Sequence, residues 1–181
     1  MAALKKLEKV SARLEENQQY LQKEFENAMD FMMRELELSG ARAALFGLDG
    51  LVSKQIITLS ILNPLLEARQ LTGQGPGLME QVEKTVLGSV EQKRESQMDQ
   101  LLLLLMSGFA VLCIDGCGEA LVFGVQGFES RGPDEPQNEV MQRGAKDGFN
   151  ESYQNNISMI RRRMKTTALK FEKAEVGSKS H

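Results

Sequence analysis

Three consecutive arginines, Arg161 to Arg163, follow a segment whose apolar residues recur at helical spacing. The segment from Arg143 to Arg163 reads RGAKDGFNESYQNNISMIRRR. Guanidinium groups bind carboxylates and phosphates through paired, charge-assisted hydrogen bonds. The chemistry that this cluster could support is therefore anion binding, and the anion could be a small molecule or an acidic side chain of a protein.

The apolar side chains of the predicted helix form one narrow stripe at 3.6 residues per turn. The residues of this stripe are Phe149, Tyr153, Ile157, Ile160 and Met164. Arg161 and Arg163 fall on opposite shoulders of the stripe, and Asn156 shares the shoulder of Arg163. Glu151 in the first turn complements the positive end of the helix dipole, and the arginines complement its negative end.

Two interpretations of the arginines remain open. In the structural one, the shoulder arginines lay their stems over the edge of the core and pair with carboxylates of the preceding loop. In the other, Arg143 and the shoulder arginines form a clamp for a carboxylate or a phosphate. The candidate residues for binding a ligand or a partner are Arg143, Glu151, Asn156, Arg161 and Arg163. No nucleophile or proton-shuttling histidine accompanies them, so we predict no catalytic residues and no enzymatic activity.

Four other residues have types that could do chemistry. Asp49 and Asp115 each end a predicted strand before a glycine, a position that can be catalytic but usually belongs to a turn. Cys113 and Cys117 lack CxxC spacing, and the single histidine is His181 at the end of the sequence. We therefore expect two reduced thiols beside a turn, with no metal site and no cofactor.

The bulk properties of the chain limit its class. Its 181 residues suit one domain, with or without extra elements. The net charge of −3 and the pI of 5.4 argue against a nucleic-acid-binding protein with a broad basic face. The longest apolar stretch, Leu101 to Ile114, is shorter than the roughly 20 residues that a membrane-spanning helix needs. As given, the chain is expected to be soluble.

Alternating and apolar runs predict five strands, near residues 32–38, 42–48, 109–115, 119–125 and 168–175. The first four form two hairpins around glycine-containing turns, and hairpins require antiparallel pairs. The helical connections between them also allow parallel pairs. The predicted fold class is therefore α/β, with a mixed β-sheet of about four to five strands covered by helices.

Helical patterns occupy the remaining segments. Residues 1–30 are predicted to form an amphipathic helix, which either packs on its own domain or forms a coiled coil. A second helix is expected to begin after Ser53 as its N-cap and to kink or break near Asn63, because Pro64 follows. Two further helices are predicted near 77–88 and 92–107.

An alternating strand followed by a glycine turn occurs twice. Residues 31–48 read FMMRELELSGARAALFGL, and the sequence from Leu169 reads LKFEKAEVGSKSH. An apolar strand follows the first turn, whereas the sequence stops after the second. We therefore expect an N-terminal helix at 1–30, an α/β subdomain at 31–177, and a tail at 178–181 that is the truncated start of a second subdomain.

The segment EPQNEVMQRGAKDGFNESYQNNISMIRRRMKTTALKFEKAEVG resembles the signature of the A subunits of bacterial spore germinant receptors, the GerA family. The matching positions are Glu135, Pro136, Glu139, Arg143, Gly144, Gly148, Phe149, Glu151, Asn156, Ile160, Arg161 and Arg163. The earlier run RAALFGLDGLVSKQIITLSILNPLLE is similar to the first strand and following helix of the family. The likeness covers most of residues 31–177.

The resemblance implies the first subdomain of the soluble N-terminal region of a receptor subunit. Family members continue into a second soluble subdomain, membrane-spanning helices and a cytoplasmic tail. The implied function is nutrient germinant sensing, receptor assembly and signalling in spore germination, without enzymatic activity. The implied partners are the B and C subunits, other A subunits and a small-molecule germinant, but no nucleic acid.

The resemblance also implies a location and a role for the arginines. The full-length protein would reside at the spore inner membrane, held there by C-terminal segments that the sequence lacks, and reduced cysteines favour the core side. The arginines would form a polar clasp within or between subunits. The alternative is a small-molecule binding module in which germinant lies between the sheet edge and the arginine helix.

Overall fold

The computed structural model describes residues 7–68, 71–86, 90–127, 149 and 151–174. Its centre is a five-stranded sheet of order β1-β2-β4-β5-β3. The strands are β1 (Phe31–Leu38), β2 (Ala41–Leu48), β3 (Gln92–Glu95), β4 (Ala110–Ile114) and β5 (Ala120–Phe123). The predicted α/β class is confirmed. The expected mixture of parallel and antiparallel pairs is wrong, because all four neighbouring strand pairs are antiparallel.

Both predicted hairpins are present. In the first, β1 and β2 pair from Phe31↔Leu48 to Leu38↔Ala41. The two residues of its turn, Ser39 and Gly40, have φ values of 55° and 82°, which suits the tight turns that match the twist of paired strands. In the second hairpin, β4 and β5 pair on either side of the turn that begins at Asp115.

The helix predicted over residues 92–107 is shorter, and a strand precedes it. Residues 92–95, with the sequence QKRE, form β3 at the sheet edge and pair with β5. The helix itself, α5 (Met98–Leu105), begins where the apolar residues begin. In the sequence, β3 lies between β2 and β4 and runs in the direction opposite to β2. Helix α5 then returns the chain to the end of the sheet where β3 began, so β4 runs in the same direction as β3 and antiparallel to β2.

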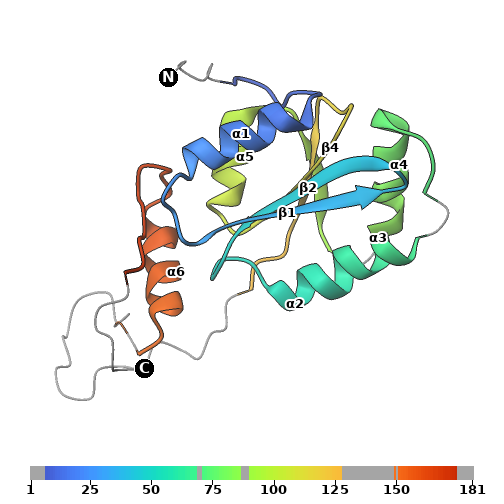
Figure 1. The fold of residues 1–181 in the computed structure, drawn as a ribbon. Coiled ribbons are helices and arrows are strands. Elements are labelled where there is room, and N and C mark those ends of the chain that lie inside the picture. Colours follow the sequence, from blue (N-terminus) through green and yellow to red (C-terminus); the bar gives the residue numbers. More distant parts are fainter. Residues whose placement is uncertain (1–6, 69–70, 87–89, 128–148, 150, 175–181) are drawn as a thin grey trace.

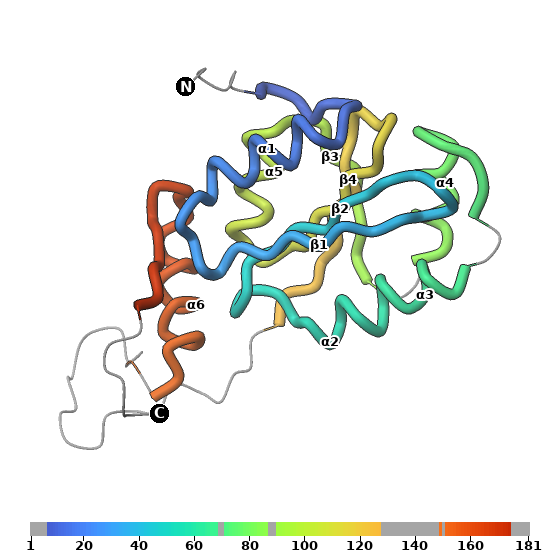
Figure 2. The backbone as a smooth tube through the Cα atoms, viewed as in Figure 1, coloured from blue at the N-terminus to red at the C-terminus, as the bar shows by residue number. Residues whose placement is uncertain are grey.

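Helices cover both faces of the sheet (Figures 1 and 2). One face packs against α2 (Lys54–Ile56), η1 (Ile57–Leu62), α3 (Asn63–Glu67) and α4 (Gly75–Val86). The other packs against α1 (Leu14–Glu24) and α5. Neighbouring residues of β2 therefore enter different cores: Leu45 lies in the first and Phe46 in the second. Burial on both faces explains why the central strands are almost continuously apolar.

The N-terminal helix packs on its own domain, as one of the two interpretations predicted. Leu14, Leu21 and Phe25 are buried against the sheet. The described helix α1 spans only Leu14–Glu24 of the predicted range 1–30. Its start is set in part by Asp115, whose Oδ1 accepts a hydrogen bond from the backbone N–H of Leu14 at 3.0 Å.

The helix after β2 continues through Pro64 instead of breaking. Ser53 caps its start, because its Oγ accepts a hydrogen bond from the N–H of Ile56 at 3.2 Å. The expected distortion takes the form of the π-helical segment η1, which directly precedes α3. Pro64, which has no N–H to donate, lies at the start of α3, directly after the π-helical segment, where the hydrogen-bonding pattern of the helix changes.

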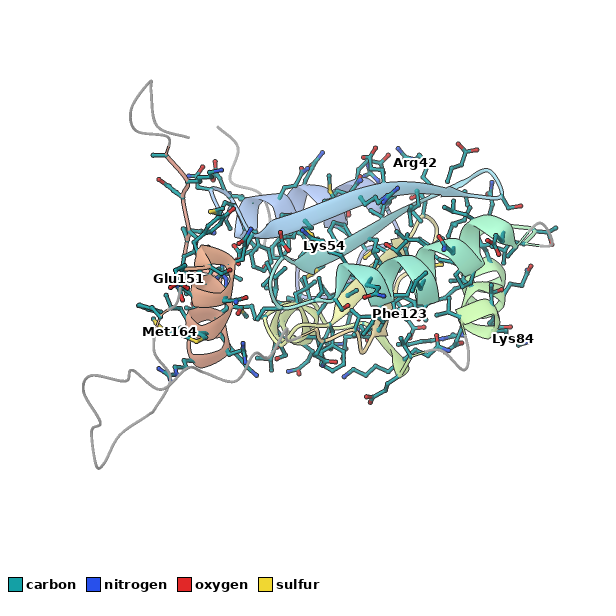
Figure 3. The ribbon with its side chains drawn as sticks, turned by 90° about the horizontal axis from the view of Figure 1, so that it is seen from below. Arg42, Lys54, Lys84, Phe123, Glu151 and Met164 are labelled. Carbon is teal, nitrogen blue, oxygen red and sulfur yellow. The ribbon has the colours of Figure 1, made fainter. Side chains whose placement is uncertain are left out.

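The last described helix, α6 (Tyr153–Arg163), lies outside the two helical layers, at the end of the domain where β1 begins (Figures 1 and 3). The strand predicted at 168–175 is wrong for the described residues, since 168–174 form no strand. A strand requires a neighbour along its length, and here a single backbone bond, from Met29 N–H to the carbonyl of Phe171 at 2.9 Å, joins the segment to the start of β1.

Candidate docking site at the arginine helix

Helix α6 approaches the domain through a glycine. Ser152 caps the helix, with its Oγ accepting a hydrogen bond from the N–H of Asn155 at 3.3 Å. A Cβ atom on Gly50 would lie 3.3 Å from the carbonyl oxygen of Gln154 and 3.4 Å from Cβ of Ser158. Gly50 also has a φ of 82°, a backbone conformation that residues other than glycine rarely adopt. This residue therefore permits the close approach of α6.

Arg161 is the buried centre of the contact between α6 and the domain. Its side chain is 0% exposed, and Asp30, just before β1, is 3% exposed. Nε of Arg161 donates to Oδ2 of Asp30 at 2.8 Å, and Nη2 donates to Oδ1 at 2.9 Å. This is a bidentate pairing, in which the planar guanidinium matches both carboxylate oxygens.

The remaining contacts of Arg161 hold the segment that follows α6. Nη1 donates to the carbonyl of Leu169 at 2.9 Å and to that of Thr166 at 3.2 Å. The guanidinium also lies over the ring of Phe171, 5.0 Å from its centroid, a distance suited to a cation–π contact. We call Arg161, Asp30, Phe171 and the two carbonyl groups the clasp.

Further polar contacts support the clasp from both sides. Nζ of Lys165 donates to Oγ of Ser107 at 3.0 Å, just after α5. Oγ1 of Thr167 donates to a carboxylate oxygen of Glu24 at 3.1 Å, and Nζ of Lys170 donates to the backbone carbonyl of Glu24. The described part of α6 and its following segment is therefore attached to the domain mainly by hydrogen bonds and charge.

Three of the five residues of the apolar stripe of α6 are exposed, and the other two, Ile157 and Ile160, are half-buried. Phe149 is 71% exposed, Tyr153 is 47% exposed and Met164 is 52% exposed, whereas Ser158 and Arg161 are buried. The expectation that the stripe would face the core, with the arginines at its edge, is wrong. The reason is the clasp: the buried Asp30 carboxylate requires a cation, so the face of α6 that contains Arg161 turns inward.

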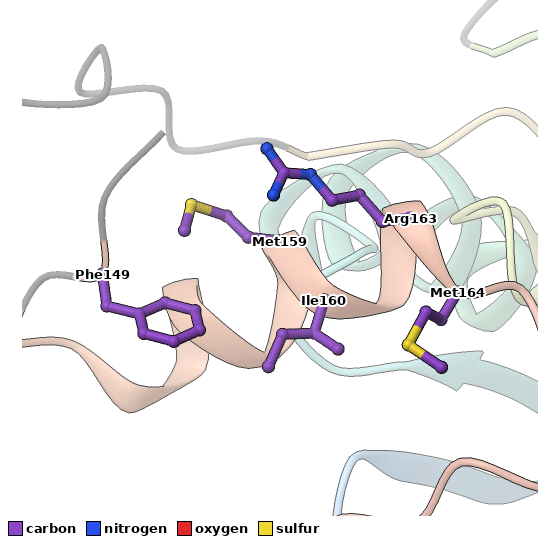
Figure 4. Close-up of a pocket in the computed structure, with 5 residues that line it drawn as sticks. All are labelled: Phe149, Met159, Ile160, Arg163 and Met164. Carbon is purple, nitrogen blue, oxygen red and sulfur yellow. The ribbon is translucent and has the colours of Figure 1, made fainter. Parts of the chain in front are cut away.

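A shallow pocket of about 270 Å³ lies on the outer side of α6. It is lined by Phe149, Met159, Ile160, Arg163 and Met164 (Figure 4). The pocket combines apolar walls with the guanidinium group of Arg163, which is suited to bind an apolar group next to an acidic one.

A model of the family described as "Bacillus/Clostridium GerA spore germination protein" matches residues 19–181. The chain belongs to the GerA family. A relative, spore germination protein KA of Bacillus subtilis (strain 168), is 37% identical over 174 residues, which cover 93% of this chain and 31% of the relative. The membrane protein YfkQ of the same organism is 30% identical over 173 residues, covering 94% of this chain and 33% of YfkQ. The chain thus spans about a third of the length of these two relatives.

The fold recurs in a solved structure, the crystal structure of the N-terminal domain of the A subunit of the Bacillus megaterium spore germinant receptor GerK3. The TM-score is 0.74 at 22% identity, and the match covers 97% of this chain and 64% of that one. The prediction that the chain resembles the N-terminal region of a GerA-family A subunit is confirmed. The GerA family is one of receptor subunits, not of enzymes, as the sequence predicted.

The predicted site residues of this GerA-family chain lie in different environments. Arg161 forms the clasp, and Arg163 lines the pocket on the opposite side of α6. Asn156 is half-buried on α6, and Glu151 is exposed just before it. Arg143 lies outside the described residues. The structure therefore does not bring Arg161 and Arg163 into one clamp, and the binding roles of these residues stay predictions.

Asp30, the carboxylate partner of Arg161, was not among the residues predicted from the sequence. A carboxylate of the loop before α6 was expected, but Asp30 lies 131 residues upstream of the arginine. The available signal was a lone acidic residue inside the apolar run AMDFMM, at the beginning of a predicted strand. An acidic residue in such a run is buried only if a cation pairs with it.

The other residues considered for chemistry have structural roles. Asp49 accepts a hydrogen bond from the N–H of Gly50 at 2.9 Å and pairs with Lys54 at 2.7 Å, and Asp115 caps α1. Cys113 and Cys117 are both free and buried, as predicted. Burial raises the pKa of Cys113 to about 12, so its thiol stays protonated and unreactive at neutral pH. Among the described residues, no helix has both the length and the apolar composition that crossing a bilayer requires.

Proposed function

We propose that this chain is a docking and signal-relay domain of a spore germinant receptor A subunit. It takes part in nutrient germinant sensing and in receptor assembly, and it performs no catalysis. Its proposed partners are the B and C subunits and other A subunits of the receptor, in a complex at the spore inner membrane. Segments beyond this sequence would attach the full-length protein to that membrane, and the buried thiols favour the core side.

The observation that supports this proposal is the orientation of α6. The clasp fixes the helix to the domain by its polar face, which leaves Phe149, Tyr153 and Met164 of the apolar stripe exposed. An amphipathic helix of a globular domain normally buries its apolar side. A helix held firmly in the opposite orientation is suited to contact another protein surface and to pass a displacement of that surface to β1.

The experiment compares variants of the stripe and of the clasp in spores. Replacing Ile160 by serine removes an apolar contact of the outer face, whereas replacing Leu59, an exposed residue of η1, by serine is the matched control. We expect Ile160→Ser to reduce the amount of assembled receptor and nutrient-triggered germination, and Leu59→Ser to leave both unchanged. Normal assembly and germination with Ile160→Ser would contradict the proposed role of α6.

A second candidate function is direct binding of a small germinant in the pocket lined by Arg163. Its apolar walls and the guanidinium of Arg163 suit a small molecule with a carboxylate and an apolar group. Because the Arg161–Asp30 pair is buried between α6 and the start of β1, we assign this alternative to the outer pocket. Titration with amino acids and sugars, followed by NMR, tests it. Saturable shifts at Arg163 and Phe149 that disappear in Arg163→Met would favour this function over docking.

A further inference from the structure

Strand β1 is an open edge of the sheet. Within the described part of the chain, the order β1-β2-β4-β5-β3 leaves β1 and β3 each with a neighbouring strand on one side only. Figure 1 shows β1 on the outside of the sheet, between the helical layer of α1 and that of α2 and α3. An edge strand presents backbone N–H and carbonyl groups that can pair with a further strand.

The two edges of the sheet differ in length and in what covers them. β3 has four residues, and residues 8–10 pair with the chain just beyond its end. There the N–H of Val10 donates to the carbonyl of Ser96 at 2.9 Å, and the N–H of Met98 donates to that of Glu8 at 3.0 Å. β1 has eight residues, contains no proline and pairs with β2 in one unbroken register. Because edge strands that avoid pairing are usually short, bulged or interrupted by proline, β1 is the edge suited to accept a strand.

Two hydrogen bonds determine which backbone groups of β1 point away from β2. The N–H of Asp49 donates to the carbonyl of Asp30 at 2.7 Å, so hydrogen-bonded pairs occur at every second residue from Asp30 onward. On the other side of β2, the N–H of Asp115 donates to the carbonyl of Arg42 at 2.8 Å, so the backbone of Arg42 faces β4. Both bonds give the same result. The even-numbered residues of β1 bond to β2, and the odd-numbered ones point outward.

The free edge of β1 therefore consists of the backbone groups of Met33, Glu35 and Glu37. Outside the sheet, no described residue forms a backbone hydrogen bond with these three residues. Phe31 is different, because its N–H donates to the carbonyl of Ala28 at 3.1 Å. Each of the three residues offers one donor and one acceptor, so an added strand can form a regular ladder with them.

On the face of β1 that lies toward α1, this edge is acidic. Glu35 and Glu37 are both exposed, and neither forms an ion pair with a described residue. Arg42 lies opposite Glu37 in the register, but its guanidinium pairs with Glu15 and lies 3.9 Å from Asp115. A strand added to β1 on this side would therefore bring its side chains next to two carboxylates without a cation.

On the opposite face, the same edge is largely apolar. Met32 and Leu36 are half-buried and pack against the core under η1, α3 and α4. Arg34 is exposed between them, and an arginine stem can cover a neighbouring apolar side chain. The two faces of the edge thus favour different side chains in a strand that lies beside it.

A second copy of the chain does not suit this edge. Residues directly opposite each other in an antiparallel pair lie on the same face, and like charges in that position are destabilising. If two copies of β1 paired around a two-fold axis through all three free residues, Glu35 would lie opposite the same residue of the other copy. The acidic residues therefore disfavour self-pairing and favour a basic partner.

We propose that β1 accepts an antiparallel strand from a partner protein, and that lysine or arginine alternates with apolar residues in this strand. The basic side chains would lie next to Glu35 and Glu37, and the apolar ones next to Met32 and Leu36, because successive side chains of a strand point to opposite faces. Backbone bonds to the free edge provide affinity, and the alternation provides specificity. This surface is separate from the apolar stripe of α6, and the inference does not rest on the proposed function.

Hydrogen exchange of the 181-residue chain tests the added strand. The probe is a short, end-capped peptide in which lysine and valine alternate. At saturating peptide, we expect exchange at the amides of Met33, Glu35 and Glu37 to slow by at least about tenfold, because these amides gain a partner. The amides of Arg34 and Leu36, which already bond to β2, should change little. Protection of odd and even residues alike, or of neither, would overturn the proposal.

Three modified peptides separate strand addition from simple attraction between charges. A peptide of the same composition, with its lysines and valines in separate blocks, keeps the charge and loses the alternation. In the antiparallel arrangement the lysine amides donate to β1, so N-methylation of the lysines should abolish protection and N-methylation of the valines should preserve it. Protection by the block peptide, or by the peptide with methylated lysines, would overturn the proposal.

Variants of the chain test the choice of partner. Glu35→Gln combined with Glu37→Gln should lower the affinity for the alternating peptide by about tenfold at low ionic strength, and Glu80→Gln, at an exposed position of α4, should leave it unchanged. Unchanged affinity in the double variant would refute the selection of a basic strand. Protection of the three amides without peptide, increasing with the concentration of the chain, would assign the edge to a second copy and overturn the choice of partner. None of these measurements involves receptor assembly or germination, so failure of the proposed function would be seen separately.

Discussion

Replacing Arg161 with methionine tests the clasp as the main attachment of α6. The substitution keeps much of the side-chain volume but leaves the carboxylate of Asp30 without either of its two guanidinium bonds. Asp30 is 3% exposed, so water cannot replace the lost donors while α6 stays docked. Removing one partner of a buried ion pair costs about 3–5 kcal/mol, a large share of the roughly 5–15 kcal/mol that stabilises a typical domain.

Detachment of α6 from the rest of the domain would limit this loss of stability. Once the helix leaves, the Asp30 carboxylate is hydrated, and the penalty cannot exceed the free energy that held α6 in place. We therefore expect Arg161→Met to abolish protection from hydrogen exchange in residues 153–163 while β4 and β5 stay protected. The free energy of unfolding, measured by urea titration, should fall by about 3 kcal/mol or less if the separation precedes global unfolding.

Two matched variants make the reasoning refutable. Arg162→Met removes an exposed neighbouring arginine and should change the free energy of unfolding by at most about 0.5 kcal/mol. Combining Arg161→Met with Asp30→Leu removes both charges and should restore much of the loss, because no unpaired charge remains. Equal effects of Arg161→Met and Arg162→Met, or strict additivity in the double variant, would refute the view that a buried charge pair holds the helix.

Three further outcomes follow from single contacts. Gly50→Ala places a Cβ 3.3 Å from a backbone carbonyl of α6 at a φ of 82°, and we expect hydrogen exchange of α6 to rise more than that of the sheet. Asp115→Ala removes the bond to the N-terminus of α1 and should lower the free energy of unfolding by about 1 kcal/mol in urea titration, with Asp99→Ala as an exposed control. Burial raises the pKa of Cys113 from 9.0 to about 12, so the contribution of this thiol to the free energy of unfolding is fully present below pH 9 and is lost as the pH rises above 9. Alkylation of Cys113 at pH 8 should therefore require urea.

The sheet was largely predictable because its signals are local. The turn at Ser39 and Gly40 and the glycine turn after β4 define two hairpins in the sequence itself. The edge strand β3 escaped prediction because four charged or polar residues give no apolar periodicity, and only pairing with β5 makes them a strand. The expectation of both parallel and antiparallel strand pairs was wrong for the same reason, because the direction of β4 relative to β2 depends on the presence of β3.

The candidate site was predictable in its residues but not in its geometry. The pattern of α6 identified the apolar stripe and the arginines, and both are present. Which arginine is buried could not be inferred, because its partner lies 131 residues away and helix periodicity contains no information about distant carboxylates. The usual rule that apolar faces turn inward then gave the wrong orientation for the helix.

The orientation of α6 explains why a charged residue attaches it. If the apolar stripe is reserved for a partner surface, as we propose, only the polar face of the helix is left to meet the domain. Apolar contacts on that face would compete with the stripe and would let α6 rotate, since they are non-directional. The Arg161–Asp30 pair is directional at both partners and also orders the carbonyl groups of Thr166 and Leu169. A displacement of the docked partner would therefore reach Asp30, just before β1, through a contact that has a single hydrogen-bonding geometry.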